Sequence, residues 1–160
     1  MPEIICNTSP LQYLHQIGLL QLLPKMVGRI IIPAAVQEEL DQGRRLGIDL
    51  PDIDTLPWLA IRQPLSVAAL PLVTDLGPGE TQVLALALET PDTVALIDDA
   101  LARRIAETLG IKLTGTLGVL LSAKRAGLLP AVAPFLDHLQ ELRFRVSPAT
   151  RSAVLKLAGE

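Results

Sequence analysis

Residues 93–109, TVALIDDALARRIAETL, indicate the fold class because an apolar strand leads straight into a helix. Thr93–Ile97 is apolar and rich in β-branched side chains, which favours a buried strand. Asp98 and Asp99 follow it, and the helix predicted from Asp99 ends before Gly110, a typical helix stop. A short, fully apolar strand joined to a helix is typical of a parallel sheet that helices cover on both faces.

The same alternation of strand and helix extends in both directions from this stretch. Ser9 and Ser147 each precede a proline, so each is predicted to cap a helix whose first residue is that proline. Between Gly43 and Gly79 the pattern weakens because prolines recur, Pro71 among them. We predict further strands at 4–6, 29–32, 112–114 and, less strongly marked, 58–61; helices at 10–24 with a break at Gly18, at 33–42, 80–89, 116–126 and 131–142; and a last helix after Phe144–Val146. This order predicts an α/β fold with a central parallel sheet.

The composition fits one globular domain over residues 1–160. The chain is 49% hydrophobic and 19% charged, with a mean hydropathy of +0.41, which excludes a disordered chain. Aromatic residues make up only 2%, so a surface that stacks several bases on aromatic rings is excluded. The net charge of −3 argues against holding nucleic acid by phosphate neutralisation alone, but it leaves room for an acidic, metal-loaded site.

The cysteine count and the apolar runs suggest a cellular location. Cys6 is the single cysteine, so an internal disulfide and a Cys-rich zinc site are both excluded and a packed thiol is the expected state. The N-terminal residues lack the pattern of an export signal, and no apolar run approaches the roughly 20 residues that span a bilayer. We therefore expect a soluble, cytoplasmic protein without a membrane segment.

Several acidic side chains are predicted to gather at one edge of the sheet. Sites in parallel sheets form beyond the carboxyl ends of the strands, which is where Asp98 and Asp99 lie. In the helix after residue 33, a turn of about 100° per residue places Glu39 beside the buried stripe and Glu38 on the opposite face. Glu80 falls in the first turn of its helix, where the helix dipole favours a negative charge.

With Asn7 after the first strand, these residues form a set of oxygen donors. Carboxylates that gather without a basic neighbour repel one another unless a cation compensates. Mg²⁺ and Mn²⁺ prefer oxygen ligands and suit a small carboxylate cluster. The candidate metal-binding residues are Asn7, Glu39, Glu80, Asp98 and Asp99.

Five segments together resemble the PIN-domain family, in particular the VapC-like toxin nucleases. They are ICNTSPLQYL, IIIPAAVQEEL, LGPGETQVLALALE, ALIDDALARRIAETLGI and TGTLGVLLSAKRAGLL, and they cover nearly the whole chain in the family's order. The resemblance implies a Rossmann-like three-layer α/β/α fold and an acid cluster that binds Mg²⁺ or Mn²⁺ to hydrolyse RNA.

The resemblance also assigns roles to residues. The first family acid falls on Asn7, the second on Glu39, the third on Glu80 and the fourth on Asp99, with Asp98 as a neighbour. It makes Glu39, Glu80 and Asp99 the catalytic residues. Hydroxyls that could donate to phosphate or to metal-bound water are those of Thr8, Ser9, Thr114 and Thr116. The implied partners are RNA, a small antitoxin protein and a second copy of the chain in a dimer.

Two other interpretations stay open. Position 7 usually carries Asp in the family, and Asn offers a carbonyl oxygen without charge, so the chain could be a weakened PIN domain that binds RNA or protein. A phosphorylatable receiver-like domain would use Asp98 and Asp99, but it needs a lysine after the last strand, and Lys112 precedes that strand. Locally, Asp98 and Asp99 also fit a helix cap followed by a first-turn acid.

Overall fold

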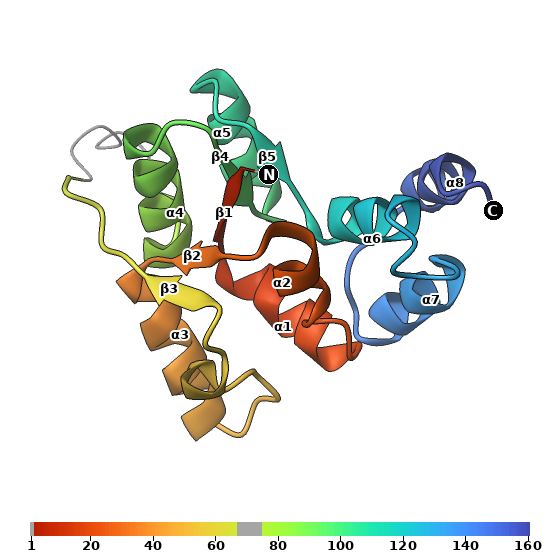
Figure 1. Cartoon of the computed structure of the whole chain (residues 1–160), viewed down its shortest axis with the longest axis horizontal. Coiled ribbons are helices and arrows are strands. Elements are labelled where there is room, and N and C mark those ends of the chain that lie inside the picture. The colour runs from red at the N-terminus through yellow and green to blue at the C-terminus, as the bar shows by residue number, and fades with distance from the viewer. Residues whose placement is uncertain (1, 67–74) are drawn as a thin grey trace.

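The computed structural model describes residues 2–66 and 75–160, and it shows a parallel sheet flanked by helices (Figure 1). Met1 and residues 67–74, with Pro71 of the proline-rich stretch, lie outside the described residues. The five strands pair in the order β3-β2-β1-β4-β5, and every pair is parallel. The strands are β1 Glu3–Cys6, β2 Ile30–Ile32, β3 Leu59–Ile61, β4 Thr93–Leu96 and β5 Leu113–Thr114. The predicted α/β fold is confirmed.

Eight α-helices connect and cover the strands within the described residues. They are α1 Thr8–Gln16, α2 Leu22–Val27, α3 Ala34–Arg45, α4 Pro78–Glu89, α5 Ala100–Thr108, α6 Thr116–Arg125, α7 Ala133–Glu141 and α8 Pro148–Leu157, with a short 3₁₀ turn η1 at Ile53–Thr55. Gly18, between α1 and α2, has a φ of +76°, so it ends the first helix where the sequence predicts a break. Each predicted helix is present, with ends that differ by a few residues.

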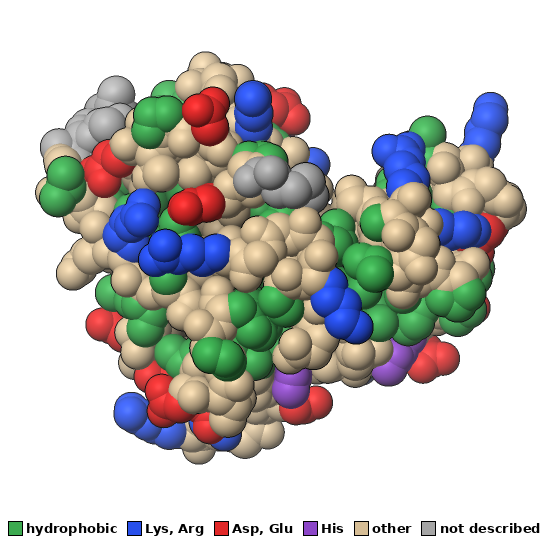
Figure 2. All heavy atoms as spheres, in the orientation of Figure 1, with side chains coloured by type: hydrophobic (Ala, Val, Ile, Leu, Met, Phe, Trp, Pro, Cys, Tyr) green, Lys and Arg blue, Asp and Glu red, His purple; other side chains and the backbone are tan. Residues whose placement is uncertain are grey.

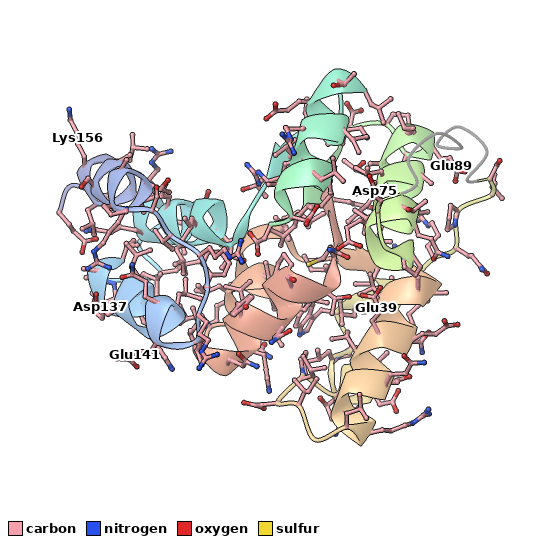
Figure 3. The ribbon with its side chains drawn as sticks, turned by 180° about the vertical axis from the view of Figure 1, so that it is seen from behind. Glu39, Asp75, Glu89, Asp137, Glu141 and Lys156 are labelled. Atoms are coloured by element: carbon pink, nitrogen blue, oxygen red, sulfur yellow. The ribbon has the colours of Figure 1, made fainter. Side chains whose placement is uncertain are left out.

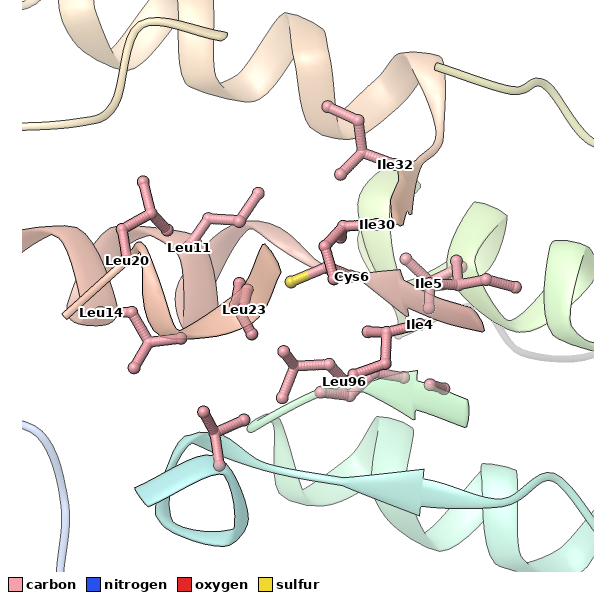
Figure 4. Packing of buried hydrophobic residues seen from close by; sticks show 14 of the residues in the cluster. Ile4, Ile5, Cys6, Leu11, Leu14, Leu20, Leu23, Ile30, Ile32 and Leu96 are labelled. Atoms are coloured by element: carbon pink, nitrogen blue, oxygen red, sulfur yellow. The ribbon is translucent and has the colours of Figure 1, made fainter. Parts of the chain in front are cut away.

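The central strand β1 is buried from both sides, as its apolar sequence requires. In Figure 4 the Cys6 side chain points toward the α1–α2 segment, where Leu11 and Leu23 lie, and α4 lies on the other side of the strand. Ile5 and Cys6 are fully buried within one continuous apolar cluster. Burying an Ile or Leu side chain contributes about 1.5–3 kcal/mol, so these contacts hold the carboxyl end of β1 in a fixed place.

The predicted Ser9 cap is wrong, whereas the Ser147 cap is confirmed. The backbone N–H of Asn7 still donates to Leu96 O of the neighbouring strand at 3.0 Å, so β1 passes into α1 without a loop and Asn7 is the residue that precedes the helix. Ser9 therefore lies already inside the first turn of α1. Ser147 accepts a hydrogen bond from Thr150 N at 3.1 Å and Pro148 is the first residue of α8, as predicted.

The predicted end of α3 before Gly43 is also wrong, because the helix continues to Arg45. A Cβ atom on Gly43 would collide with the Leu50 side chain, so glycine lets the following loop pack against the helix. The strand favoured at 58–61 is present as β3 on the sheet edge.

The C-terminal helices α6, α7 and α8 lie to one side of the sheet (Figure 1). The Glu160 carboxylate accepts hydrogen bonds from Val132 N at 2.7 Å and Ala133 N at 3.1 Å, at the start of α7, and from Lys124 Nζ at 2.9 Å. These donors, the Val132 amide foremost, lower the pKa of Glu160 to about 2. In the described part of the chain, no helix has the length and apolar character needed to cross a membrane.

Candidate functional site

Three of the predicted acid-cluster positions come together at the carboxyl edge of the sheet. Asn7 follows β1, Glu39 lies in α3, and Glu80 lies in the first turn of α4. Asn7 Nδ2 donates to Glu80 Oε1 at 3.1 Å, and the Thr8 hydroxyl donates to Glu39 Oε2. Figure 3 shows Glu39 where α3 and α4 approach each other. We call Asn7, Thr8, Glu39 and Glu80 the Asn7 cluster.

The amide oxygen of Asn7 is buried without a hydrogen-bond partner. Asn7 is 2% exposed, and its Oδ1 is the one buried side-chain polar atom of the described residues that lacks a partner. Buried polar atoms are normally paired, so an oxygen without a protein partner is suited to accept a water molecule or an ion. A carbonyl oxygen beside carboxylates is a donor set that a hard divalent cation accepts.

Because Gly79 has no side chain, the side-chain oxygens of Asn7 and Glu39 can both lie close to its backbone. A Cβ atom on Gly79 would lie 2.8 Å from Glu39 Oε1 and 2.9 Å from Asn7 Oδ1, and one on Gly77 would lie 2.7 Å from Glu80 Oε2. All three distances are shorter than real Cβ atoms tolerate, so each glycine leaves space for the neighbouring side-chain oxygens. The sequence analysis missed this steric role of Gly77 and Gly79.

Helices α3 and α4 cap each other across the cluster. Gly79 N, at the second residue of α4, donates to Glu39 Oε1 at 3.2 Å, and Ala35 N, at the second residue of α3, donates to Gln82 Oε1 at 3.0 Å. The residues before the two helices, Pro33 and Gly77, supply no side-chain cap. The exchange satisfies amides that a helix start leaves free, and it fixes Glu39 relative to α4. The sequence analysis missed Gln82. The available signal was that neither helix is preceded by a residue whose side chain could cap it, which indicates that the cap comes from elsewhere.

Removing the Gln82 acceptor tests this exchange. Gln82→Met leaves the buried Ala35 N–H unpaired, so we expect the free energy of unfolding in urea to fall by about 1–3 kcal/mol. Gln42→Met, on the exposed side of α3, is the matched control and should stay within about 0.5 kcal/mol of the wild type. Equal stability of the two variants would contradict cross-helix capping.

Asp98 belongs to a different group of contacts. It accepts hydrogen bonds from Thr116 N at 2.8 Å and Thr116 Oγ1 at 2.6 Å, at the start of α6. Burial raises the pKa of Asp98, and the Thr116 donors and the nearby Arg103 oppose the rise. Asp98 is therefore hydrogen-bonded to the start of α6, whereas the hydrogen bonds of the Asn7 cluster involve residues of α3 and α4.

Asp99 caps α5. It is exposed, and its Oδ2 accepts a hydrogen bond from Ala102 N at 2.9 Å. The cap is therefore Asp99 itself, one residue later than the local sequence interpretation has it. Among the described residues no three His, Cys, Asp or Glu side chains are grouped so as to hold a metal ion, and the Asn7 cluster contains two carboxylates and one amide. The role of Asp99 as a metal ligand stays a prediction.

Of the predicted substrate-contacting residues, some lie in or beside the Asn7 cluster and the others lie near Asp98. Thr8 bonds to Glu39, and Ser9 is half-buried beside it in the first turn of α1. Thr116 is fully buried and its hydroxyl is used by Asp98, so it supports Asp98 instead of facing a substrate. Thr114 ends β5 and lines a cleft next to Asp98.

Cys6 is a packed thiol, as expected. It is completely buried, and its Sγ–H donates to Asn7 O at 3.3 Å. Burial raises the pKa of the thiol well above its ordinary value, and the negative charge of Asp98 adds to the rise. A buried thiol that stays protonated is a poor nucleophile, which agrees with a packing role for Cys6.

Comparison with known protein families gives a match over almost the whole chain. The family model described as DUF3368, a PIN domain, matches residues 3–160. No curated protein matches the chain.

Proposed function

Because this chain belongs to the PIN-domain family, whose members are typically nucleases, we propose that it is a metal-dependent ribonuclease and the toxin of a toxin–antitoxin pair. The observation that carries the proposal is the unpartnered Asn7 Oδ1 beside the Glu39 carboxylate. A partly buried site that collects oxygen atoms, and whose carboxylates form no ion pair with Lys or Arg among the described residues, fits a divalent cation. The short antitoxin partner and the dimer rest on the resemblance of the sequence alone.

The residues of the Asn7 cluster would hold Mg²⁺ or Mn²⁺ through Asn7 Oδ1 and the carboxylates of Glu39 and Glu80. When bound, such an ion lowers the pKa of a water molecule and stabilises negative charge on phosphate. The chain itself supplies orientation: Thr8 and Gly79 N each hold one oxygen of Glu39, while Asn7 holds Glu80. The carboxylates are therefore set in place before any substrate arrives.

A cleavage assay tests the proposed activity. We expect a labelled single-stranded RNA to be cut with Mn²⁺ or Mg²⁺ and to stay intact in EDTA, and a DNA of the same sequence to be cut more slowly. Equal cutting in EDTA would contradict a metal-dependent site. Growth arrest on expression, relieved by co-expression of a neighbouring small gene, is the expected result for a toxin.

One observation favours the second candidate function, a PIN domain that binds RNA or protein without cutting it. The Asn7 cluster has two carboxylates, and position 7 contributes a neutral amide. RNA binding without cleavage at any metal concentration would support this alternative. The receiver-like interpretation loses its support for two reasons. Asp98 is hydrogen-bonded to Thr116, and Lys112 precedes β5 instead of following it.

A further inference from the structure

A second polar site lies beside the Asn7 cluster, in a cleft between the sheet and the C-terminal helices. The cleft has a volume of about 380 Å³ and is lined from α5, β5, α6 and the start of α8. Figure 2 shows the surface hollowed between these two parts of the molecule, with Lys and Arg side chains on either side. The lining residues that bear on its chemistry are Asp98, Arg103, Gly115, Phe144, Arg145 and Thr150.

Two arginines line this cleft without a carboxylate partner of their own. In the parts of the chain that the structure describes, neither Arg103 nor Arg145 takes part in an ion pair. The one hydrogen bond that Arg103 makes among those residues is from Nη1 to Ile97 O, at 2.9 Å. A guanidinium carries five N–H donors, so most of those of Arg103 remain for a ligand.

The one acid in the cleft, Asp98, offsets only part of this charge. Asp98 turns its oxygens to Thr116 N and Oγ1, so its lone pairs are directed into the start of α6. A Cβ atom on Gly115 would lie 2.9 Å from both Arg103 Nη1 and Asp98 Oδ1, so glycine lets the guanidinium rest against the start of α6. Two guanidinium groups against one hydrogen-bonded carboxylate leave the cleft positive, in a chain whose net charge is −3.

We propose that this cleft binds a phosphate group of the RNA strand through Arg103 and Arg145, one or more nucleotides away from the bond that is cut. That the ligand is RNA rests on the proposed function. That the cleft binds phosphate rests on the residues that line it. Guanidinium groups match phosphate oxygens in geometry and charge. The apolar Leu117 and Phe144, which also line the cleft, would accommodate the sugar.

The position of the cleft favours a nucleic-acid strand over an acidic protein segment. Asn7 N donates to Leu96 O, so the ends of β1 and β4 are neighbours, and Asp98 follows Leu96 by two residues. The Asn7 cluster and the cleft therefore lie at the same carboxyl edge of the sheet. A single nucleic-acid strand has regularly spaced phosphates, so it can contact the Asn7 cluster and the cleft at the same time. An acidic protein segment lacks this regular spacing of phosphate groups.

RNA affinity measured in EDTA tests the cleft apart from the metal site. The probe is a short fluorescent oligoribonucleotide, whose binding to the chain of residues 1–160 is followed by anisotropy at several salt concentrations. Arg145 is exposed, so Arg145→Gln should fold normally. We expect it to weaken binding about 5- to 10-fold at low salt and to reduce the slope of log K against log salt by about 0.7, the value for one phosphate contact on a single strand. Arg125→Gln, at the exposed end of α6, is the charge-matched control and should leave the slope unchanged.

The outcomes separate this inference from the proposed function. Equal losses for Arg145→Gln and Arg125→Gln would overturn the cleft as a site, since only net charge would matter. Competition by a polyglutamate peptide as effective as that by unlabelled RNA would overturn nucleic acid as the occupant. RNA cleavage that depends on Glu39 but is accompanied by unchanged affinity in Arg145→Gln overturns the cleft alone. Absent cleavage with the expected loss of affinity overturns the nuclease and keeps the cleft.

Discussion

Glu39→Gln should reduce Mn²⁺-dependent RNA cleavage by at least about 100-fold while leaving the fold intact. Loss of an outer-shell partner alone typically costs a metal site 10- to 100-fold, and we propose Glu39 as a direct ligand. Its two oxygens accept from Gly79 N and Thr8 Oγ1. A glutamine can keep the bond from Gly79 N, and the Thr8 hydroxyl can rotate to accept from its amide, so the free energy of unfolding should change by less than about 1 kcal/mol.

The neighbouring residue supplies the control. Glu38→Gln removes the same charge from the adjacent position of α3, but Glu38 faces solvent whereas Glu39 is half-buried. We expect the activity of Glu38→Gln to stay within about twofold of the wild type, as is usual for an exposed substitution away from a site. Retention of more than half of the activity in Glu39→Gln would remove the Asn7 cluster from the reaction.

Local pattern predicted the sheet because most of its strands contain a short apolar run. Ile30–Ile32 and Thr93–Leu96 become β2 and β4 with the expected neighbours, and even the less clearly marked β3 joins in parallel. The errors lie where a tertiary contact decides a boundary. Asn7 precedes α1 and its N–H pairs with β4, and α3 passes Gly43, a residue against which Leu50 packs.

The candidate site was predictable only in part, for a related reason. Helical phase separated Glu39 from Glu38 correctly, since burial of one face follows from 3.6 residues per turn. The pairing of Gln82 with Ala35 N joins residues that are distant in the chain, and no local pattern encodes it. The division of the acids between two groups is likewise tertiary, because it depends on Thr116 reaching Asp98 and on Gly79 approaching Glu39.

Asn7→Asp should weaken the metal-free protein and strengthen metal binding. Asn7 Nδ2 now donates to Glu80 Oε1 at 3.1 Å, and an aspartate would place a negative charge against that carboxylate. Losing this bond and adding like-charge repulsion in a buried position should lower the free energy of unfolding in EDTA by about 1–3 kcal/mol. The third charge should also raise affinity for Mn²⁺ by about tenfold or more, since ligand charge sets the affinity of such sites.

Thermal unfolding with and without Mn²⁺ measures both effects on one sample. An ion that binds only the folded state raises its stability with ion concentration, so the Mn²⁺-induced rise in Tm should be larger for Asn7→Asp than for the wild type although its Tm in EDTA is lower. Gln42→Glu adds the same charge on the exposed side of α3 and should change neither value appreciably. An Asn7→Asp variant as stable as the wild type in EDTA would show that the amide does not bridge Glu80. An unchanged response to Mn²⁺ would show that Asn7 Oδ1 does not face a cation site.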